Sequence, residues 1–325
     1  MKNYVFISAL GKEINDYLQL RKSQGFSENV NYVLQRLDQY LACAGADEKI
    51  LTSDVIDGFI AQIRTKVRPN TISTYVTMCS GLGKYLNHIG IPAFVAEHFP
   101  NPKDYIPYVF SEEEIVEIFR IADNLPMERG CVAAFQIPML LRILYGCGLR
   151  LGEALTLKLS NIDFNKGVIC VLNGKGKKDR LVPMDKSLAS ILDQYCKSVL
   201  LVADPEQHIF PGNSAVGTHG ESWARYWFIR ILKEVGLYTE IDHSISGRGI
   251  CLHCLRHTFA VNSYRSQYFS GIDNYRTAPI ISVYLGHERL TSTEQYLHFC
   301  EENYQDILSI TEQYAGVFPE VPDEE

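Results

Sequence analysis

A run of prolines divides this chain and limits what it can fold into. Four prolines lie within residues 91–109, where each removes a backbone N–H donor and disfavours helix. Helical periodicity stops before this segment and resumes after it. The pattern predicts two domains, residues 1–92 and 108–318, joined by a linker over 93–107 and followed by an acidic tail over 319–325.

The segment before the prolines has the spacing of a helical domain. Apolar residues recur every three or four positions between residues 4 and 90, which predicts four helices. Ser53 is a candidate N-cap for a third helix that ends at Ile63. Asn70 or Thr71 opens a fourth helix that ends at Gly90.

Basic residues and threonines surround the start of that fourth helix. Arg64, Lys66 and Arg68 precede it, and Thr71 and Thr74 lie in its first turns. Cations and hydroxyls beside a helix N-terminus suit a phosphate backbone. Two interpretations stay open here, a DNA contact and a basic loop in water.

The segment after the prolines is also mainly helical, but it contains a hairpin. Ser111 and Glu114 form a capping box, and a long apolar helix follows near residues 132–145. Val168–Leu172 and Arg180–Met184 have the pattern of two short strands around a polar turn. Five more helices are expected, near residues 187–200, 222–236, 253–266, 278–285 and 303–314. The predicted fold class is mainly α, a four-helix N-terminal domain plus a helix-rich α+β domain with a small antiparallel sheet.

The charge distribution bears on what the chain can bind. The formal net charge of −7 argues against a polyanionic partner. However, no Lys or Arg follows Arg289, whereas nine acidic residues do, so residues 1–289 carry 31 basic and 29 acidic side chains. This asymmetry permits nucleic-acid binding without establishing it. The alternative is a solvated acidic C-terminus on an ordinary protein.

Hydropathy and cysteine content predict the compartment. No stretch approaches the 18 or more apolar residues that a membrane helix requires, and the N-terminus turns charged too early for a secretory signal. The nine cysteines are an odd number and are scattered, which favours free thiols in a reducing environment. We therefore expect a cytoplasmic protein without membrane contact.

Four segments carry side chains that could perform chemistry. In the first, Gly146 and Gly148 break a helix, and Arg150 opens another with Glu153 on the same face. A carboxylate beside a guanidinium orients its fork before any ligand binds. The alternative is a structural ion pair at a helix start.

The second segment is the turn of the hairpin. It contains Lys175, Lys177, Lys178 and Arg180 among glycines. The turn lacks the GxxxxGK[ST] spacing and does not run from a strand into a helix, so we exclude nucleotide binding. A lysine-rich tip can reach into a DNA groove, and a solvated turn is the alternative.

The third segment combines cysteine, histidine and arginine between Cys251 and His257. Its C-x2-C and H-x3-H spacings suggest zinc. Arg256 would place a fixed cation beside that metal, and no second CxxC pair exists in the chain, so we predict no metal site. Instead, His253 and Arg256 share one helical face and direct two donors at one point. That arrangement suits a phosphoryl group that bears charge in a transition state.

The fourth segment presents His287 in a glycine turn, with Tyr296 nine residues later. Because the chain has 19 tyrosines, Tyr296 alone carries little information. Taken in order, however, the motifs GLRxxE, GKGxKxR, HxLRH and LGHxxxxxTxxY resemble those of the tyrosine recombinases, the phage-integrase type of site-specific recombinase. The resemblance covers residues 108–300 by motif. It extends to the N-terminal helices by layout, since family members carry a helical core-binding domain there.

The resemblance implies a mechanism and a role for each motif residue. Tyr296 would attack a DNA phosphodiester and form a 3′-phosphotyrosine, while Arg150 and Arg256 would grip the non-bridging oxygens. Lys175 would protonate the departing 5′-oxygen. Of the other positions, His253 would assist proton transfer and His287 would donate a hydrogen bond to the phosphate. Glu153 would hold Arg150 in place. No metal, nucleotide or other cofactor is implied.

The resemblance also implies partners. They are double-stranded DNA and further copies of the chain, in a tetramer on paired sites that exchanges a C-terminal segment, expected around Asn303–Tyr314. The biological role would be that of a mobile-element integrase or an Xer-like resolvase. Two alternatives stay open: a type IB topoisomerase-like enzyme that relaxes DNA, and a catalytically silent DNA-binding accessory protein.

Overall fold

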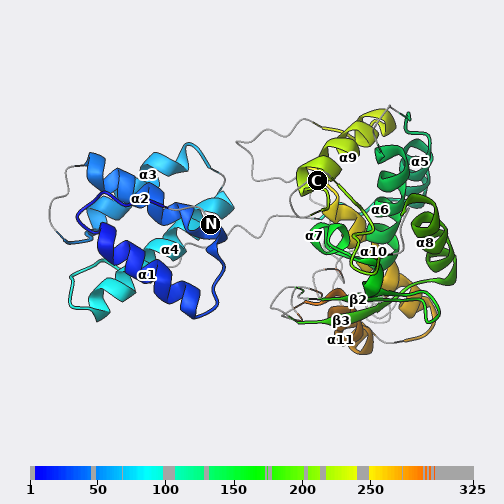
Figure 1. The fold of residues 1–325 in the computed structure, drawn as a ribbon. Coiled ribbons are helices and arrows are strands. Elements are labelled where there is room, and N and C mark those ends of the chain that lie inside the picture. Colours follow the sequence, from blue (N-terminus) through cyan, green and yellow to red (C-terminus); the bar gives the residue numbers. More distant parts are fainter. Residues whose placement is uncertain are drawn as a thin grey trace, which may run out of the picture. The chain divides into compact units, whose positions relative to one another are not determined.

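A computed structural model of the protein shows two compact units (Figure 1). One unit holds the described residues before residue 107, and the other holds those from residue 107 onward. The structure describes residues 4–44, 49–67, 69–97, 107–127, 132–172, 174, 178–200, 204–212, 217–239, 249–272, 274–287, 290, 293 and 296.

The first unit packs its helices around an apolar core. They are α1 (Gly11–Ser23), the 3-10 helix η1 (Glu28–Val30), α2 (Tyr32–Cys43), α3 (Ser53–Arg64) and α4 (Pro69–His88). Ile14, Leu37 and Phe59 are buried in this core. The N-cap of α3 is Thr52, not Ser53 as expected, because the Thr52 hydroxyl accepts a hydrogen bond from the Val55 N–H.

The second unit is helix-rich. Its helices are α5 (Glu112–Asp123), α6 (Ala133–Cys147), α7 (Leu151–Leu155), the 3-10 helix η2 (Leu159–Asn161), α8 (Lys186–Val199), α9 (Glu221–Val235), α10 (His253–Phe269) and α11 (Asn274–Leu285). The capping box of Ser111 and Glu114 starts α5 as predicted. No helix among the described residues of either unit is both long enough and apolar enough to cross a membrane.

A small antiparallel sheet completes the second unit. Its strands β1 (Ile162–Asp163), β2 (Val168–Val171) and β3 (Arg180–Pro183) lie in the order β1-β2-β3. The mainly helical fold class with a small antiparallel sheet is confirmed, and so is the β2–β3 hairpin. The sequence did not predict β1, which has only two residues. Within the hairpin, Val171 pairs with Arg180, so Arg180 stands at the strand end beside the turn.

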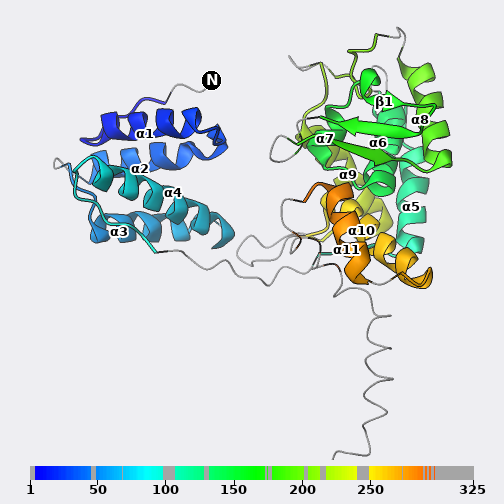
Figure 2. The same cartoon turned by 90° about the horizontal axis from the view of Figure 1, so that it is seen from below.

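Helix α6 organises the second unit. It packs against α5, α8, α9 and α10, and most of its surface is apolar, as expected of a helix enclosed by others. Figure 2 shows the sheet with α8 along one side and with α10 and α11 nearby. Gly148 ends α6 in the left-handed conformation, with φ +57°. The chain can therefore turn at once and place Arg150 at the N-cap of α7.

Several predicted features lie outside the described residues. They are Arg68, Lys175, Lys177, the helix near 303–314 and the tail over 319–325.

Candidate active site

Glu153 lies between two arginines. Arg150 donates to it twice, from Nη1 to Oε1 (2.7 Å) and from its backbone N–H to Oε2 (2.9 Å). Arg180 donates from Nη1 to Oε1 (3.0 Å) and from Nη2 to Oε2 (2.8 Å). The Arg150–Glu153 pair expected from the sequence is therefore present. The guanidinium of Arg180 joins it, although the sequence pattern predicted Arg180 at the tip of the hairpin.

The electrostatics of Glu153 follow from this arrangement. Its side chain is 10% exposed and that of Arg180 is 9% exposed. Burial alone would raise the pKa of Glu153, but the hydrogen bonds from Arg180 and from the Arg150 backbone outweigh it and hold that pKa at about 2. Glu153 is thus a carboxylate at any physiological pH, and it fixes both guanidinium groups.

Arg256 is enclosed by protein, with 1% of the residue exposed. Its Nη1 donates to the carbonyl oxygen of Gly148 (2.5 Å) and its Nη2 to that of Leu285 (2.7 Å). The Nε atom is buried and has no hydrogen-bond partner among the described residues. Because a buried donor without a partner is costly, this nitrogen would gain from an anionic ligand.

Three arginines bind consecutive carbonyl groups at the end of α11. Arg180 Nε donates to Tyr284 O (2.9 Å), Arg256 Nη2 to Leu285 O (2.7 Å) and Arg150 Nη2 to Gly286 O (2.8 Å). The last carbonyls of a helix lack partners within it and carry a partial negative charge, so they attract cations. The C-terminus of α11 therefore gathers guanidinium groups from three distant segments.

The gathered charge is positive. Among the residues that the structure describes here, three guanidinium groups accompany one carboxylate, that of Glu153. Burial and then the charge of Arg150 lower the pKa of Arg256 to about 10, while Tyr296 and Glu153 act in the opposite direction. Arg256 stays charged at neutral pH but at an energetic cost, and a bound anion would remove part of that cost.

Glycines at positive φ present two of the accepting carbonyls. Gly148 has φ +57° and Gly286 has φ +67°. A Cβ on Gly148 would lie 2.5 Å from the Phe259 ring, and one on Gly286 would lie 3.1 Å from Arg180 Cδ. Both positions therefore require glycine for the backbone conformation and for space.

The hairpin turn approaches the same site. A Cβ on Gly174 would lie 3.2 Å from Arg180 Nη1 and 3.6 Å from Glu153 Oε1. The residue that precedes Lys175 is therefore beside the Arg150–Glu153–Arg180 cluster. Lys178 is exposed on the turn.

Tyr296 lies in a group of aromatic and histidine side chains. Its hydroxyl shares a hydrogen bond of 2.9 Å with His257 Nδ1, and its ring stacks at 6.3 Å from the ring of His287. His287 Nδ1 in turn shares a hydrogen bond of 2.6 Å with the Thr293 hydroxyl. The exposed His253 packs edge-on against His257, with ring centroids 4.6 Å apart.

Two residues behave differently from the sequence-based interpretation. Arg180 was assigned to a DNA-contacting hairpin tip, but its guanidinium is buried against Glu153, because the strand pairing turns this side chain inward. His257 received no role, although it is part of the quoted HxLRH motif and it contacts the Tyr296 hydroxyl. Its position four residues after His253, on the same helical face, was the available signal.

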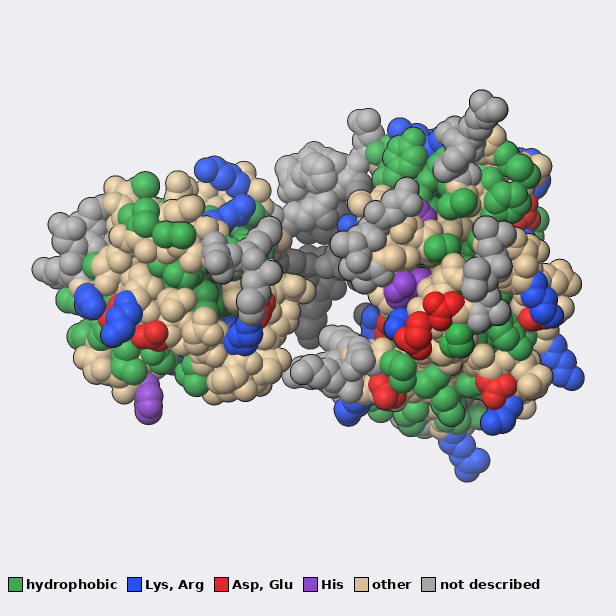
Figure 3. Space-filling model, viewed as in Figure 1, with side chains coloured by type: hydrophobic (Ala, Val, Ile, Leu, Met, Phe, Trp, Pro, Cys, Tyr) green, Lys and Arg blue, Asp and Glu red, His purple; other side chains and the backbone are tan. Residues whose placement is uncertain are grey.

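The sequence-predicted basic cluster of the first unit stays a prediction. Arg64 ends α3 and Lys66 lies in the following turn, both exposed, while Thr71 and Thr74 are half-buried on α4. In the space-filling view of Figure 3, described basic side chains are scattered over the drawn face of this unit. On the second unit, histidine, basic and acidic side chains lie together near the middle of that face.

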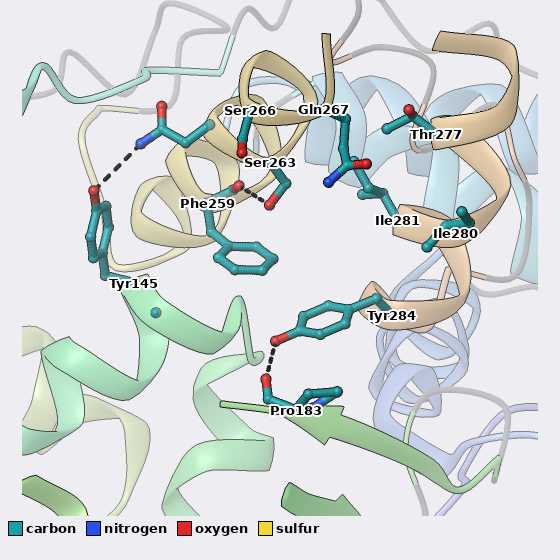
Figure 4. Close-up of a pocket in the computed structure, with 12 residues that line it drawn as sticks. Tyr145, Pro183, Phe259, Ser263, Ser266, Gln267, Thr277, Ile280, Ile281 and Tyr284 are labelled. Carbon is teal, nitrogen blue, oxygen red and sulfur yellow. Dashed lines mark hydrogen bonds between the residues drawn. The ribbon is translucent and has the colours of Figure 1, made fainter. Parts of the chain in front are cut away.

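A cavity of about 510 Å³ lies between the end of α6, the strand β3 and helices α10 and α11 (Figure 4). Phe259, Ile280 and Ile281 contribute apolar walls. The Tyr284 hydroxyl, which also lines it, donates to the Pro183 carbonyl (2.9 Å). This cavity adjoins the arginine cluster, since Tyr284 contributes its carbonyl to Arg180.

The fold of the chain resembles that of solved recombinases. The XerH site-specific recombinase, solved with a palindromic difH substrate, matches with a TM-score of 0.64 at 20% identity, over 86% of this chain and 78% of that one. A lambda integrase dimer bound to a COC' core site matches with a TM-score of 0.62 at 16% identity, over 88% of this chain and 76% of that one. At these identities the likeness shows the fold alone.

Curated relatives agree with that fold. Tyrosine recombinase XerA of Pyrococcus horikoshii is 28% identical over 254 residues, 77% of each chain. Tyrosine recombinase XerD of Listeria innocua is 24% identical over 309 residues, 90% of this chain and 96% of that protein. A Sinorhizobium fredii protein named as an integrase or recombinase, y4rB, is 32% identical over 204 residues, which cover 60% of this chain and 62% of that protein.

The fold and these relatives define the class as that of the tyrosine recombinases. The sequence profile of the phage integrase family matches residues 109–303, more than half of the chain. The chain therefore belongs to the phage integrase family.

Proposed function

We propose that this chain is a site-specific DNA recombinase that cuts and rejoins DNA through a 3′-phosphotyrosine on Tyr296. The observation that most supports this proposal is the convergence of Arg150 and Arg256 on adjacent carbonyls at the end of α11. The surplus positive charge there suits one phosphodiester. The fold and relatives of the phage integrase family are consistent with this chemistry.

In the proposed reaction, the Tyr296 oxygen attacks a DNA phosphorus and the bond to the 5′-oxygen breaks. Arg150 and Arg256 hold the non-bridging oxygens, and Glu153 with Arg180 keeps Arg150 in place. Removing one preorganised donor of this kind costs about 2.7–4 kcal/mol of transition-state stabilisation. Lys175 supplies the proton for the departing 5′-hydroxyl, His253 assists the loss of the tyrosine proton, and His287 donates to the phosphate.

Rejoining reverses the same step. A 5′-hydroxyl attacks the phosphotyrosine, restores the phosphodiester and releases Tyr296. Because one ester replaces another, the reaction needs no nucleotide as an energy source. The fixed guanidinium groups supply the charge stabilisation, so we expect adduct formation to proceed in the presence of a metal chelator.

A nicked DNA duplex tests the proposal. The duplex would be selected for binding from a random-sequence pool and nicked beside the cleavage position, so that the short 5′-hydroxyl fragment diffuses away and the adduct accumulates. We expect an SDS-resistant protein–DNA adduct that Tyr296→Phe abolishes. Tyr226→Phe, on the exposed face of α9, is the matched control and should leave the adduct intact. An undiminished adduct with Tyr296→Phe would move the nucleophile elsewhere.

The proposal includes double-stranded DNA and further copies of this chain as partners. We propose a tetramer on paired sites, in which neighbours exchange the segment around Asn303–Tyr314. The cavity beside α11 is large enough to accept apolar side chains, and Ile280 at its edge is 67% exposed. Ile280→Lys should then prevent the recombined product while adduct formation on a single site persists.

The same assays separate the alternative functions. A type IB topoisomerase-like enzyme would relax supercoiled DNA as a monomer and give no product from paired sites. An accessory protein would bind DNA without an adduct. We further propose that Arg64, Lys66, Arg68, Thr71, Thr74, Lys177 and Lys178 contact the DNA backbone, and that the protein acts on DNA in the cytoplasm.

A further inference from the structure

The cysteine pair before α10 has no role in the proposed reaction. Cys251 lies in the turn that leads into α10, Cys254 lies in the first turn of that helix, and His253 stands between them. The two Sγ atoms are 3.9 Å apart, and the Cys251 N–H donates to Cys254 Sγ (3.4 Å). The two thiols therefore face each other across one turn of the chain.

This arrangement can close into a disulfide. Residues three apart on a regular helix have Cβ atoms about 5–6 Å apart, whereas a disulfide needs about 3.5–4.5 Å. Cys251 precedes α10, so helical spacing does not hold its backbone. The sulfurs need to approach by roughly 2 Å to reach a bond length of about 2.05 Å.

The two thiols differ in their access to solvent. Cys254 is fully buried in the apolar core of the second unit, whereas Cys251 is only half-buried. A small disulfide in solution can therefore react with Cys251 but not directly with Cys254. Thiol–disulfide exchange proceeds through such a mixed disulfide, which a second, neighbouring thiol then resolves.

We infer that Cys251 and Cys254 form a reversible disulfide by exchange with a small disulfide such as glutathione disulfide, and that this bond slows cleavage. The Cys251 thiolate attacks one sulfur of glutathione disulfide and expels a glutathione thiolate. The Cys254 thiolate then attacks Cys251 Sγ and expels the second glutathione. In total the protein thiols lose two protons and two electrons, and glutathione disulfide is reduced to two glutathione thiols.

The effect on cleavage rests on the proposed function and on which sulfur moves. Cys254 is held in place, because its carbonyl accepts from the Thr258 hydroxyl (2.9 Å), which accepts in turn from the Phe110 N–H (2.9 Å). The approach must therefore come from Cys251, and the turn that carries His253 moves with it. Because His253 is the proposed proton-transfer residue, the disulfide displaces it from its working position.

Peptide mapping of the full-length protein tests the bond without DNA. Trypsin cleavage after Arg248 and Arg256 leaves both cysteines on the peptide 249–256. After treatment with glutathione disulfide, this peptide should resist iodoacetamide under denaturing conditions and be lighter by two hydrogen atoms. Dithiothreitol should restore both alkylations. Cys254→Ser should instead retain one glutathione on Cys251, whereas Cys251→Ser should carry none on this peptide.

Adduct formation on the nicked duplex tests the effect on cleavage. The oxidised protein should react at least about tenfold more slowly, since a positioned proton-transfer group contributes about 10²–10⁴-fold, and dithiothreitol should restore the rate. Cys251→Ser is the matched control, because it keeps the other eight of the nine cysteines. After the same treatment it should react at the rate of the reduced wild type.

The outcomes are distinct. The inference is overturned if both thiols of the peptide still react with iodoacetamide after the treatment, or if the protein with the disulfide forms the adduct as fast as the reduced protein. It is also overturned if the treatment slows Cys251→Ser as much as the wild type, which would place the sensitive thiol elsewhere. Failure of the proposed function shows separately, in the reduced protein, as an adduct that survives Tyr296→Phe.

Discussion

Replacement of Glu153 by Gln tests how the site is held together. Glu153 accepts four hydrogen bonds from Arg150 and Arg180. Glutamine preserves the shape and one oxygen acceptor but removes the charge that both guanidinium groups face. The substitution should therefore weaken the folded second unit and release Arg150 from its fixed orientation.

The size of the effect follows from the pKa of Glu153. Against burial, the two arginines lower that pKa from 4.5 to about 2. A shift of this size corresponds to about 3 kcal/mol of unfolding free energy at neutral pH. Breaking buried ion pairs elsewhere costs about 3–5 kcal/mol, which is consistent. We expect Glu153→Gln to lower the free energy of unfolding by about 3 kcal/mol.

The sign of the pH dependence is fixed by the direction of the shift. The folded-state pKa lies below the unfolded one, so the stabilisation is complete above an unfolded-state pKa of 4.5 and is lost as the pH falls towards 2. The difference between wild type and Glu153→Gln should therefore shrink by about half between pH 7 and pH 3. Because glutamine does not titrate, the Glu153→Gln variant lacks this contribution at every pH and serves as the reference.

Tryptophan fluorescence measures this unit selectively. The chain has two tryptophans, Trp223 and Trp227, and both lie on α9 of the second unit. Unfolding in guanidinium chloride, followed by this fluorescence, gives the free energy of unfolding of that unit. Glu117→Gln, which breaks the exposed Glu117–Arg120 pair on α5, is the matched control and should cause no measurable loss. A loss below about 1 kcal/mol for Glu153→Gln, or a loss independent of pH, would refute the reasoning.

Three further predictions concern the arginines, a glycine turn and DNA binding. Arg256→Ala should slow adduct formation about 10²–10³-fold with little loss of DNA affinity. Arg256→Lys should also be slow, because a single ammonium cannot replace the guanidinium fork that binds two carbonyls. Equal losses of rate and affinity would make Arg256 a docking residue. Gly236→Ala should cost about 1 kcal/mol because the position has positive φ. Gly286→Ala should cost more, because its Cβ would also lie 3.1 Å from Arg180 Cδ, and it should slow adduct formation. Gly236→Ala should not slow adduct formation, because nothing lies within 4 Å of a Cβ there. DNA affinity should fall steeply with salt in a binding titration, since backbone contacts release counterions; a flat dependence would contradict the proposed phosphate contacts.

Local features were predictable from the sequence. The Arg150–Glu153 pair spans three residues at a helix start, and the capping box of Ser111 and Glu114 has the same spacing. Such contacts depend on the local backbone alone. The β2–β3 hairpin was also visible because its turn residues and strand pattern are contiguous, whereas β1 was too short to show a period.

Non-local features were not predictable. Arg180 is 27 residues from Glu153 in the chain, and nothing near it in sequence indicates that strand pairing directs it inward. The carbonyls of residues 284–286 carry no sequence signal at all, although they bind three guanidinium groups. The motif identified Tyr296 as a candidate, but its burial against His257 depends on how α10 and the segment after α11 pack.

Identification of the residue that carries the DNA tests the central claim most directly. Residues 290–325 contain no Lys or Arg, so trypsin cleavage after Arg289 leaves Tyr296, Tyr304 and Tyr314 on one peptide that begins at residue 290. The trapped adduct would be digested with nuclease and trypsin, and the peptide fragmented in a mass spectrometer. We predict a nucleotide 3′-phosphate on Tyr296. The same mass on Tyr304, on Tyr314 or in another peptide would contradict the account.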